Sequence, residues 1–276
     1  MRKPSRTPFF WLLMAVLSIT FIGPLVIMAL TSFKTNVEAK QAPPTIIPHE
    51  WTLRAYRQLF VVDDASPVLS WLGNSLFAAA VNALLVCLFA SMAAYAFARL
   101  PLRGKNVLFA LVLSTMFVPG FIFFMPNFEI MSKLQWLDTL AAIIFPGTAG
   151  AFGVFFLRQF FISLPLELEE SARIDGAGPF KTFFQIVLPN ARGALMTLLV
   201  LSFLGNWNDF VWPIYVLFSD SRLTLPVGLT RLQGSYTIDY PVIMAGGTVA
   251  AVPVLIFYVI LQRYIIEGVA SSGIKG

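Results

Sequence analysis

Six long apolar stretches restrict the fold of this chain more than any other feature. They cover about residues 9–33, 69–98, 106–126, 140–163, 194–218 and 242–262. A helix needs about 20 apolar residues to cross the hydrocarbon core of a bilayer, and backbone polar groups in lipid must be paired internally. Strands of a closed barrel would be short and would alternate apolar and polar residues. The stretches therefore predict an all-α membrane protein with about six transmembrane helices, forming a single domain over residues 1–276.

The composition agrees with a chain that lies in lipid. Hydrophobic residues make up 58% of the sequence and charged residues only 12%, whereas a soluble domain carries about 25% charged residues. The net charge of +5 does not indicate nucleic acid, because the basic residues lie between the apolar stretches and form no continuous patch. The only cysteine, Cys87, excludes a disulfide within the chain and a cysteine-based metal cluster. With His49 as the only histidine, we expect no metal site.

The basic residues also indicate how the chain is oriented. With six spans, both termini share one side of the membrane. That side carries Arg2, Lys3, Arg6, Arg99, Arg103, Lys105, Arg158, Arg173, Lys181, Arg192, Arg263 and Lys275. The opposite side carries Lys34, Lys40, Arg54, Arg57, Lys133, Arg222 and Arg231. Because cytoplasmic loops carry an excess of Lys and Arg, we expect both termini in the cytoplasm.

The first apolar stretch admits one other interpretation, a secretory signal peptide. The stretch is too long for such a peptide, and no small-x-small cleavage site closes it. We therefore interpret it as a retained first helix.

Prolines lie within most of the predicted spans. They are Pro24, Pro119, Pro146, Pro213 and Pro253. Each removes a backbone hydrogen bond and can kink its helix. Two interpretations stay open at this point, ordinary curvature of the bundle and kinks that shape a central cavity.

The segment 164–190, between the fourth and fifth stretches, predicts two short helices that meet at a glycine corner. Pro165 suits the first turn of a helix, and the acidic residues that follow it suit the positive end of the helix dipole. Gly176 is a left-handed C-cap candidate, and Pro179 opens a second helix that ends near Pro189. The apolar face of this second helix is predicted to comprise Phe180, Phe183, Phe184, Val187 and Leu188.

The first of these helices is expected to project a small, acidic surface that suits docking into a groove of another protein. Its residues are Glu170, Ser171, Ala172 and Asp175. The alternative is an amphipathic loop that lies on the membrane surface.

The amino-acid sequence of this segment resembles that of the cytoplasmic loop of bacterial ATP-binding-cassette importer permeases. The resemblance comprises Glu170-Ser171-Ala172, three residues, Gly176, nine residues, Ile186, one residue and Leu188-Pro189. Ser171 departs from the usual Glu-Ala-Ala by one small residue for another. The tail Gly273-Ile274-Lys275-Gly276 and the stretch Asn206-Trp207-Asn208-Asp209-Phe210 are similar to permeases of the carbohydrate-uptake, maltose-type subfamily.

The resemblance implies a permease subunit of an ATP-driven, binding-protein-dependent importer for a sugar or sugar-like solute, in the bacterial cytoplasmic membrane. Its partners would be a second, distinct permease chain, two ATPase subunits and an extracytoplasmic solute-binding protein. Glu170, Ser171, Ala172, Asp175 and Gly176 would be the contact or hinge residues toward the ATPase.

The chain itself carries no phosphate-binding loop. Such a loop needs Gly, four residues and Gly-Lys-Ser/Thr, but Gly104-Lys105 is followed by Asn106, and Arg99 occupies the first glycine position. We therefore expect that this chain is not an enzyme and binds no cofactor, and that a partner chain binds ATP and magnesium.

Asn206, Asn208 and Asp209 are the candidates for a translocation path. A carboxylate deep in a membrane helix costs about 2.5–3.5 kcal/mol on insertion scales, so Asp209 needs a role. It either faces the solute, or the helix breaks after Gly205 and Asn208 and Asp209 satisfy the freed backbone groups. Two aromatic roles also stay open for Trp207, Trp212 and Tyr215, stacking on a sugar or forming an interfacial belt.

The sequence leaves two competing functions, an ion-coupled secondary transporter and a membrane-embedded enzyme. An ion-coupled secondary transporter would commonly show internal repeats, and no convincing repeat is present. A membrane-embedded enzyme would need paired carboxylates or a His/Asp cluster at the lipid boundary, whereas Glu167, Glu169 and Glu170 are clustered on one small predicted helix.

Overall fold

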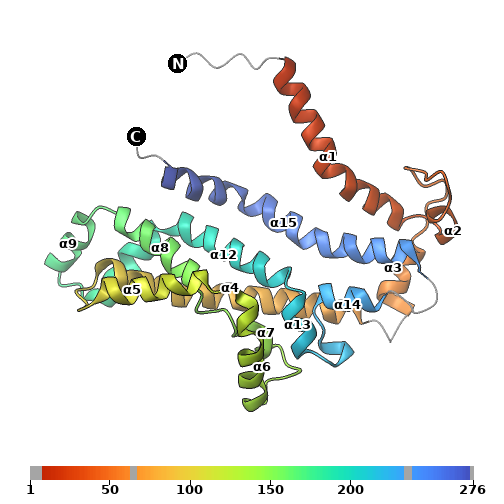
Figure 1. Ribbon diagram of the computed structural model, residues 1–276. Helices are drawn as coiled ribbons and strands as arrows, with labels where there is room; N and C mark the ends of the chain where they lie inside the picture. The colour runs from red at the N-terminus through yellow and green to blue at the C-terminus, as the bar shows by residue number, and fades with distance from the viewer. Residues whose placement is uncertain (1–7, 63–66, 233–237, 274–276) are drawn as a thin grey trace. The chain divides into compact units, whose positions relative to one another are not determined.

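The computed structural model describes residues 8–62, 67–232 and 238–273, and within these ranges every regular element is a helix. The prediction of an all-α fold is confirmed. The chain divides into two compact units (Figure 1). The first comprises residues 1–71 and 225–253, and the second comprises residues 72–224 and 254–276.

The first unit contains two long apolar helices and several short ones. The long ones are α1 (Pro8–Ser32) and the first part of α15 (Tyr240–Gly273). The short ones are α2 (Asn36–Ala39), α3 (Arg54–Arg57), the π-helical turn η1 (Gln58–Val62) and α14 (Leu225–Arg231). Glycine allows close packing here: a Cβ atom on Gly228 would lie 2.1 Å from Cδ2 of Trp71, and one on Gly247 would lie 2.9 Å from Sδ of Met28.

The loop after α1 is organised around the Glu38 carboxylate. This group accepts hydrogen bonds from the hydroxyl of Thr45 at 2.8 Å and from the backbone N–H of His49 at 2.9 Å, while Thr35 caps α2. The hydrogen bond from His49 is the main reason why the pKa of Glu38 is lowered from its ordinary value. Lys34 also donates to the backbone carbonyl of Thr45. These hydrogen bonds within the loop were not predicted from the sequence.

The second unit contains the rest of the chain's helices. After α4 (Val68–Arg99) come α5 (Lys105–Ser114), η2 (Thr115–Phe117), η3 (Gly120–Phe123), α6 (Phe124–Lys133), α7 (Ala141–Ile144) and α8 (Ala151–Ser163). They are followed by α9 (Glu167–Ile174), α10 (Pro179–Thr182), η4 (Phe183–Val187), α11 (Leu188–Asn190), α12 (Arg192–Trp207), α13 (Val211–Val216) and η5 (Asp220–Arg222).

The core of the second unit joins α4, α8, α12 and the helix after Pro179. Alanines of α4, among them Ala90 and Ala94, face Leu157, Phe183 and Leu198. A Cβ atom on Gly153 would lie 3.0 Å from Cβ of Ala90. Small residues at helix contacts let backbones approach closely, which is how helices associate in lipid.

Three of the six predicted spans are not single helices. By length and composition, α1, α4 and residues 240–260 of α15 are unbroken candidates for crossing a membrane. The predicted span 106–126 bends by 96° around Pro119. The predicted span 140–163 is interrupted between α7 and α8, and 194–218 is interrupted between α12 and α13. Three further candidates in the described residues are bent helix pairs, namely 105–117 with 120–133, 151–163 with 167–174, and 179–190 with 192–207. Counting each of these pairs as one span gives up to six spans.

The five prolines behave differently from one another. Pro24 and Pro253 lie inside continuous helices, and Pro213 is the third residue of α13. Only Pro119 and Pro146 lie in breaks of the helical backbone. Glycine directly follows both of these prolines, as Gly120 and Gly147, whereas Gly23 precedes Pro24 inside a continuous helix.

Candidate functional site

The glycine corner of segment 164–190 forms as the sequence predicts. Helix α9 ends at Ile174, Asp175 is its C-cap, and Gly176 has φ of +76°. The N–H of Gly176 donates to the carbonyl of Arg173 at 3.0 Å, and that of Ala177 to the carbonyl of Ala172 at 2.9 Å. These two bonds define a Schellman motif, which satisfies the last carbonyls of a helix and favours glycine.

Gly176→Ala is expected to loosen this corner, whereas Gly178→Ala is expected to have little effect. A Cβ atom meets nothing within 4 Å at either position, but only Gly176 has a positive φ. A left-handed backbone costs an L-residue about 1–2 kcal/mol. That cost corresponds to roughly a fivefold or greater rise in local opening. Hydrogen–deuterium exchange of peptides from segment 164–190 measures it, and equal rates in the two variants would contradict the role of the backbone angle.

The helix after the corner uses only part of its predicted apolar face. It runs from Pro179 to Asn190 through α10, η4 and α11, and bends by 80° into α12. Phe183 and Val187 are buried, and the ring of Phe183 lies 5.1 Å from that of Tyr95. Phe180 and Phe184 are exposed, so only part of the predicted apolar face is buried within this chain.

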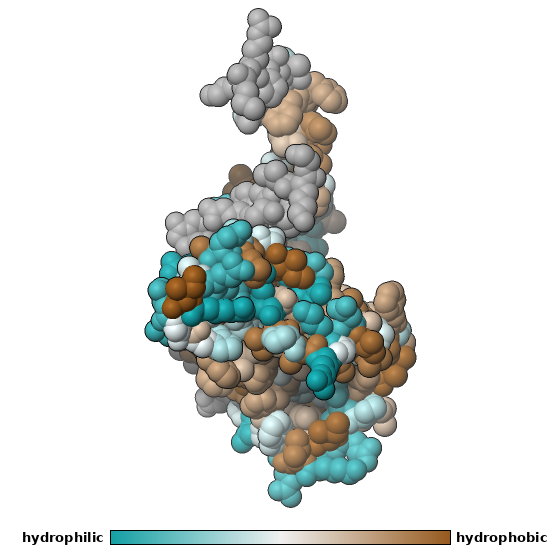
Figure 2. Space-filling view, turned by 90° about the vertical axis from the view of Figure 1, so that its left-hand side faces the viewer, coloured by the Kyte–Doolittle hydropathy of each residue, from teal (hydrophilic) through white to brown (hydrophobic). Residues whose placement is uncertain are grey.

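Most of the predicted surface of α9 is exposed, but one of its residues is buried. Glu170, Ser171, Asp175 and Gly176 are exposed as expected. Ala172 is only 6% exposed, so its predicted place on the projecting surface is wrong: it packs within the chain. Figure 2 shows the end of the second unit that carries α9, where hydrophilic side chains gather with isolated hydrophobic ones between them.

The buried face of α9 carries a charged residue that the sequence did not single out. Glu169 Oε1 lies 2.7 Å from Nε of Arg99, and their side chains are 2% and 10% exposed. The Nη2 atom of Arg99 donates to the carbonyls of Phe161 and Leu164, each at 2.7 Å. One guanidinium therefore joins the end of α4, the end of α8 and the start of α9. This arrangement makes α9 a rigid extension of two long helices.

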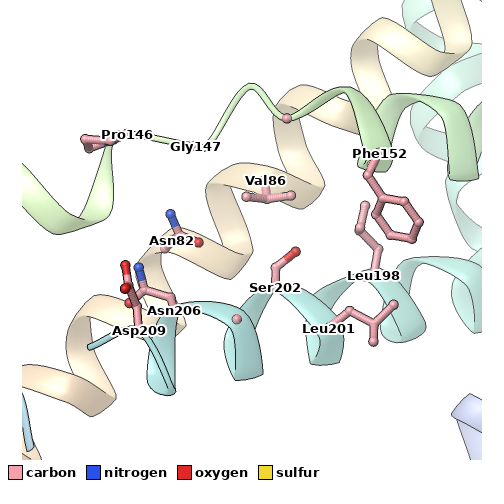
Figure 3. Close-up of a pocket in the computed structure, with 13 residues that line it drawn as sticks. Asn82, Val86, Pro146, Gly147, Phe152, Leu198, Leu201, Ser202, Asn206 and Asp209 are labelled. Atoms are coloured by element: carbon pink, nitrogen blue, oxygen red, sulfur yellow. The ribbon is translucent and has the colours of Figure 1, made fainter. Parts of the chain in front are cut away.

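A cavity of about 330 Å³ lies within the second unit between α4, α8 and α12 (Figure 3). Successive residues of one face of α12 line it, namely Leu198, Leu201, Ser202, Gly205 and Asn206, with Asp209 beyond the end of the helix. The other lining residues are Asn82, Val86, Pro146, Gly147, Gly150, Phe152 and Gly153. Of the predicted path residues, Asn206 and Asp209 line the cavity, whereas Asn208 does not.

The polar residues at this cavity also hold the broken helix α7. Its last carbonyls accept three side-chain N–H groups: Ala142 from Trp212 at 2.8 Å, Ile143 from Asn206 at 2.9 Å and Ile144 from Asn82 at 2.6 Å. In lipid, unpaired carbonyls at a helix end cost several kcal/mol each, so such a break needs side-chain donors. Asn82 was not identified from the sequence, because a lone asparagine in an apolar stretch gives no indication of its partner.

The break between α12 and α13 agrees with the structural interpretation of Asn208 and Asp209. Asn208 donates to the carbonyl of Leu204 at 2.9 Å, and Asp209 Oδ1 accepts the N–H of Trp212 at 3.3 Å. The break follows Trp207, two residues later than expected. Asp209 therefore satisfies a backbone group at the break and also lines the cavity.

The three aromatic residues near this break do not share one role, either as a sugar-stacking surface or as an interfacial belt. Trp207 and Trp212 are buried, and Trp207 stacks on Phe203 with ring centroids 5.8 Å apart. Only Tyr215 is exposed. The two tryptophans therefore belong to the packing around the break.

A second connection ties the loop before α7 to the segment after α13. Asp138 accepts hydrogen bonds from the N–H groups of Phe218 and Ser219, both at 2.9 Å, and from the hydroxyl of Ser219 at 2.5 Å. Arg222 donates to the backbone carbonyl of Asp138 at 2.8 Å. Partial burial raises the pKa of Asp138, but the hydrogen bonds from Ser219 and Phe218 outweigh this and leave the pKa below its ordinary value.

We expect this connection to weaken in acid. Because the folded-state pKa of Asp138 is lowered, its stabilisation is complete above the unfolded value of about 3.9 and is lost as pH falls through the folded value. Hydrogen–deuterium exchange of residues 217–222, corrected for intrinsic rates, should accelerate at low pH in the wild type. In Asp138→Asn it should be faster at pH 7 and show no such step. Glu129→Gln, at an exposed ion pair with Lys133, is the control, and an Asp138→Asn profile identical to the wild type would refute the assignment.

In the parts of the chain that the structure describes, no group of three or more His, Cys, Asp or Glu side chains is placed to hold a metal ion.

The comparisons with known proteins agree with one another on the family of this chain. Residues 87–270 match the family described as binding-protein-dependent transport system inner membrane component. The arabinooligosaccharides transport system permease protein AraQ of Halalkalibacterium halodurans is 35% identical, with all of both chains covered. The inner membrane ABC transporter permease protein YcjP of Escherichia coli is 32% identical over 100% of this chain and 98% of its own.

A solved structure shares the fold. It is a bacterial ABC transporter involved in the import of the acidic polysaccharide alginate, and one of its chains superposes with a TM-score of 0.84 at 22% identity, covering 96% of this chain and 99% of that chain. The resemblance seen in the segment 164–190 is therefore confirmed, as is the expectation of a transport subunit rather than an enzyme. The chain belongs to the binding-protein-dependent transport system inner membrane component family and is a membrane-embedded permease subunit of an ABC importer.

Proposed function

We propose that this chain forms half of the translocation path of a saccharide importer. The other half is a second, distinct permease chain, and two ATPase subunits that bind ATP and magnesium drive the complex. An extracytoplasmic binding protein delivers the solute. Both termini and α9 lie on the cytoplasmic side. The relative named for arabinooligosaccharides supports a saccharide as the solute.

The observation that carries the proposal is the rigid attachment of α9. A partner changes the conformation of a protein only through its differential affinity for two states, so a docking element must transmit movement without yielding. The Arg99 guanidinium connects α9 to α4 and α8 through three contacts of 2.7 Å. The helix after Gly176 continues through an 80° bend into α12. Movement of α9 therefore reaches three of the helices that pack in the second unit.

The exposed face around the corner has the features of a docking surface. Glu170, Ser171 and Asp175 present polar groups. Ile174 and Phe180 flank them with 87% and 75% of their surfaces exposed. Large apolar side chains surrounded by polar ones are the usual centre of a protein interface. The acidic groups suit a groove with basic residues at its edge.

Co-purification with the ATPase tests this docking. Ser171→Trp places a bulky group on the exposed face of α9 without touching the buried face. We expect it to abolish co-purification of the ATPase from mild detergent. Arg103→Trp, an exposed position in the loop between α4 and α5, should retain it. Wild-type chain that brings down no ATPase, together with solute uptake that follows an ion gradient, would favour a secondary transporter instead.

A further inference from the structure

We propose that the cavity in the second unit binds the neutral, hydroxyl-bearing part of the solute and rejects anionic saccharides such as uronates. This proposal rests on the saccharide importer proposed above and adds the chemical class of the solute. It concerns residues of this chain alone.

The polar end of the cavity offers hydrogen-bond acceptors. Asn82 and Asn206 use their amide N–H groups on the carbonyls of Ile144 and Ile143, which leaves their amide oxygens as acceptors. Asp209 adds a carboxylate beside them, and Ser202 adds a hydroxyl (Figure 3). Sugar hydroxyl groups are donors that match such a surface.

The lining carries a negative charge without a positive one. Asp209 is the only ionisable residue among those that line the cavity in the described structure, and none of them is Lys, Arg or His. An anionic group that entered would lose water beside a like charge and find no cation in exchange. Both effects are unfavourable. The carboxylate is thus a repulsive element of the kind that creates specificity.

The other end of the cavity is apolar and suits the C–H face of a sugar ring. Phe152 lies there with Leu198, at the opposite end from Asn82, Asn206 and Asp209 (Figure 3). The ring of Phe152 stacks on that of Phe156 with centroids 6.0 Å apart. A volume of about 330 Å³ lies within the range of about 300–1,000 Å³ of small-molecule sites. One polar and one apolar end match the two-sided character of a pyranose or furanose.

Cysteine protection in the assembled complex tests the proposal. Cys87 is the only cysteine of the chain, so Cys87→Ser with Ser202→Cys places a single thiol in the cavity. The probes are an arabinose trisaccharide and a galacturonate trisaccharide, with a small neutral thiol reagent and the complex in nanodiscs without binding protein. At twice its dissociation constant, a ligand slows modification about threefold. We expect the neutral probe to protect the thiol and the uronate to leave the rate unchanged.

Substitution of Asp209 tests whether its charge, rather than the size of the cavity, excludes the uronate. Asp209→Asn should allow the uronate to protect as well, whereas Glu129→Gln, which removes an exposed carboxylate outside the lining, should not change the pattern. If Ser202→Cys does not assemble, Gly205→Cys serves instead, since a Cβ atom there meets nothing within 4 Å. Protection by the uronate while Asp209 is unchanged, or no protection by the neutral probe, would overturn the proposal.

Uptake by the same complex in proteoliposomes, with its binding protein present, distinguishes failure of this proposal from failure of the proposed function. A complex that takes up saccharide with ATP, yet shows no protection of the cavity thiol, overturns only the cavity assignment. A complex that shows protection but no ATP-driven uptake overturns the importer function and leaves the binding site in place.

Discussion

Glu169→Ala is expected to destabilise segment 164–190 by about 3–5 kcal/mol, the usual cost of removing one partner from a buried ion pair. Arg99 would remain buried with its charge uncompensated, because its side chain is only 10% exposed in the native structure. The variant should therefore show rapid hydrogen–deuterium exchange throughout α9. We also expect the ATPase to dock weakly, since α9 would no longer be fixed to the ends of α4 and α8.

The neighbouring residue provides the control for this prediction. Glu170 has the same side chain and lies in the same helix turn, but it is exposed. Substitutions at exposed positions usually change stability by less than about 0.5 kcal/mol. Glu170→Ala should therefore keep the exchange rates of α9 near the wild-type values. Equal effects of the two substitutions would mean that the ion pair contributes nothing beyond a surface charge.

A double substitution separates stability from transmission of movement. In Arg99→Met with Glu169→Met both charges are removed, and replacing a buried pair by apolar residues is often neutral or stabilising. The carbonyls of Phe161 and Leu164 would still lose their donor. We expect the double variant to fold and bind the ATPase, but to transport less solute for each ATP hydrolysed. A wild-type ratio of transport to hydrolysis in this variant would show that the three contacts only stabilise the loop.

Gly228→Ala is expected to destabilise the first unit by about 3 kcal/mol, at the upper end of the cost of overpacking. A Cβ atom at this position would lie 2.1 Å from Cδ2 and 2.3 Å from Cε3 of Trp71. The indole of Trp71 is fully buried, so it cannot turn away without displacing its own neighbours. The measurement is the midpoint of thermal unfolding of the purified chain in detergent, followed by size-exclusion chromatography.

Gly73→Ala is the matched control for this substitution. Gly73 lies in α4, two residues after Trp71, and a Cβ atom there meets nothing within 4 Å. Alanine is a better helix former than glycine by about 1 kcal/mol, so Gly73→Ala should leave the midpoint unchanged or raise it. A similar loss of stability in both variants would indicate that glycine in α4 and α14 is needed for flexibility rather than for close packing.

The sequence by itself determined the features that depend on local backbone chemistry and on lipid. The apolar stretches had to be helical, because a backbone in hydrocarbon must satisfy its own hydrogen bonds. The corner at Gly176 and the helix start at Pro179 were also predictable. A positive φ needs glycine, and the ring of proline fits the first turn of a helix. These constraints act within a few residues of the chain.

The tertiary structure alone decided which face of each helix is buried and where the spans break. Glu169 and Glu170 are adjacent and chemically identical, and only the position of Arg99, far away in the sequence, makes Glu169 the buried one. Packing likewise buries Ala172 of α9 and leaves Phe180 of α10 exposed. The break after α7 likewise depends on donors from Asn82, Asn206 and Trp212. Such partners are chosen by packing between distant segments, and no local pattern in the sequence records that choice.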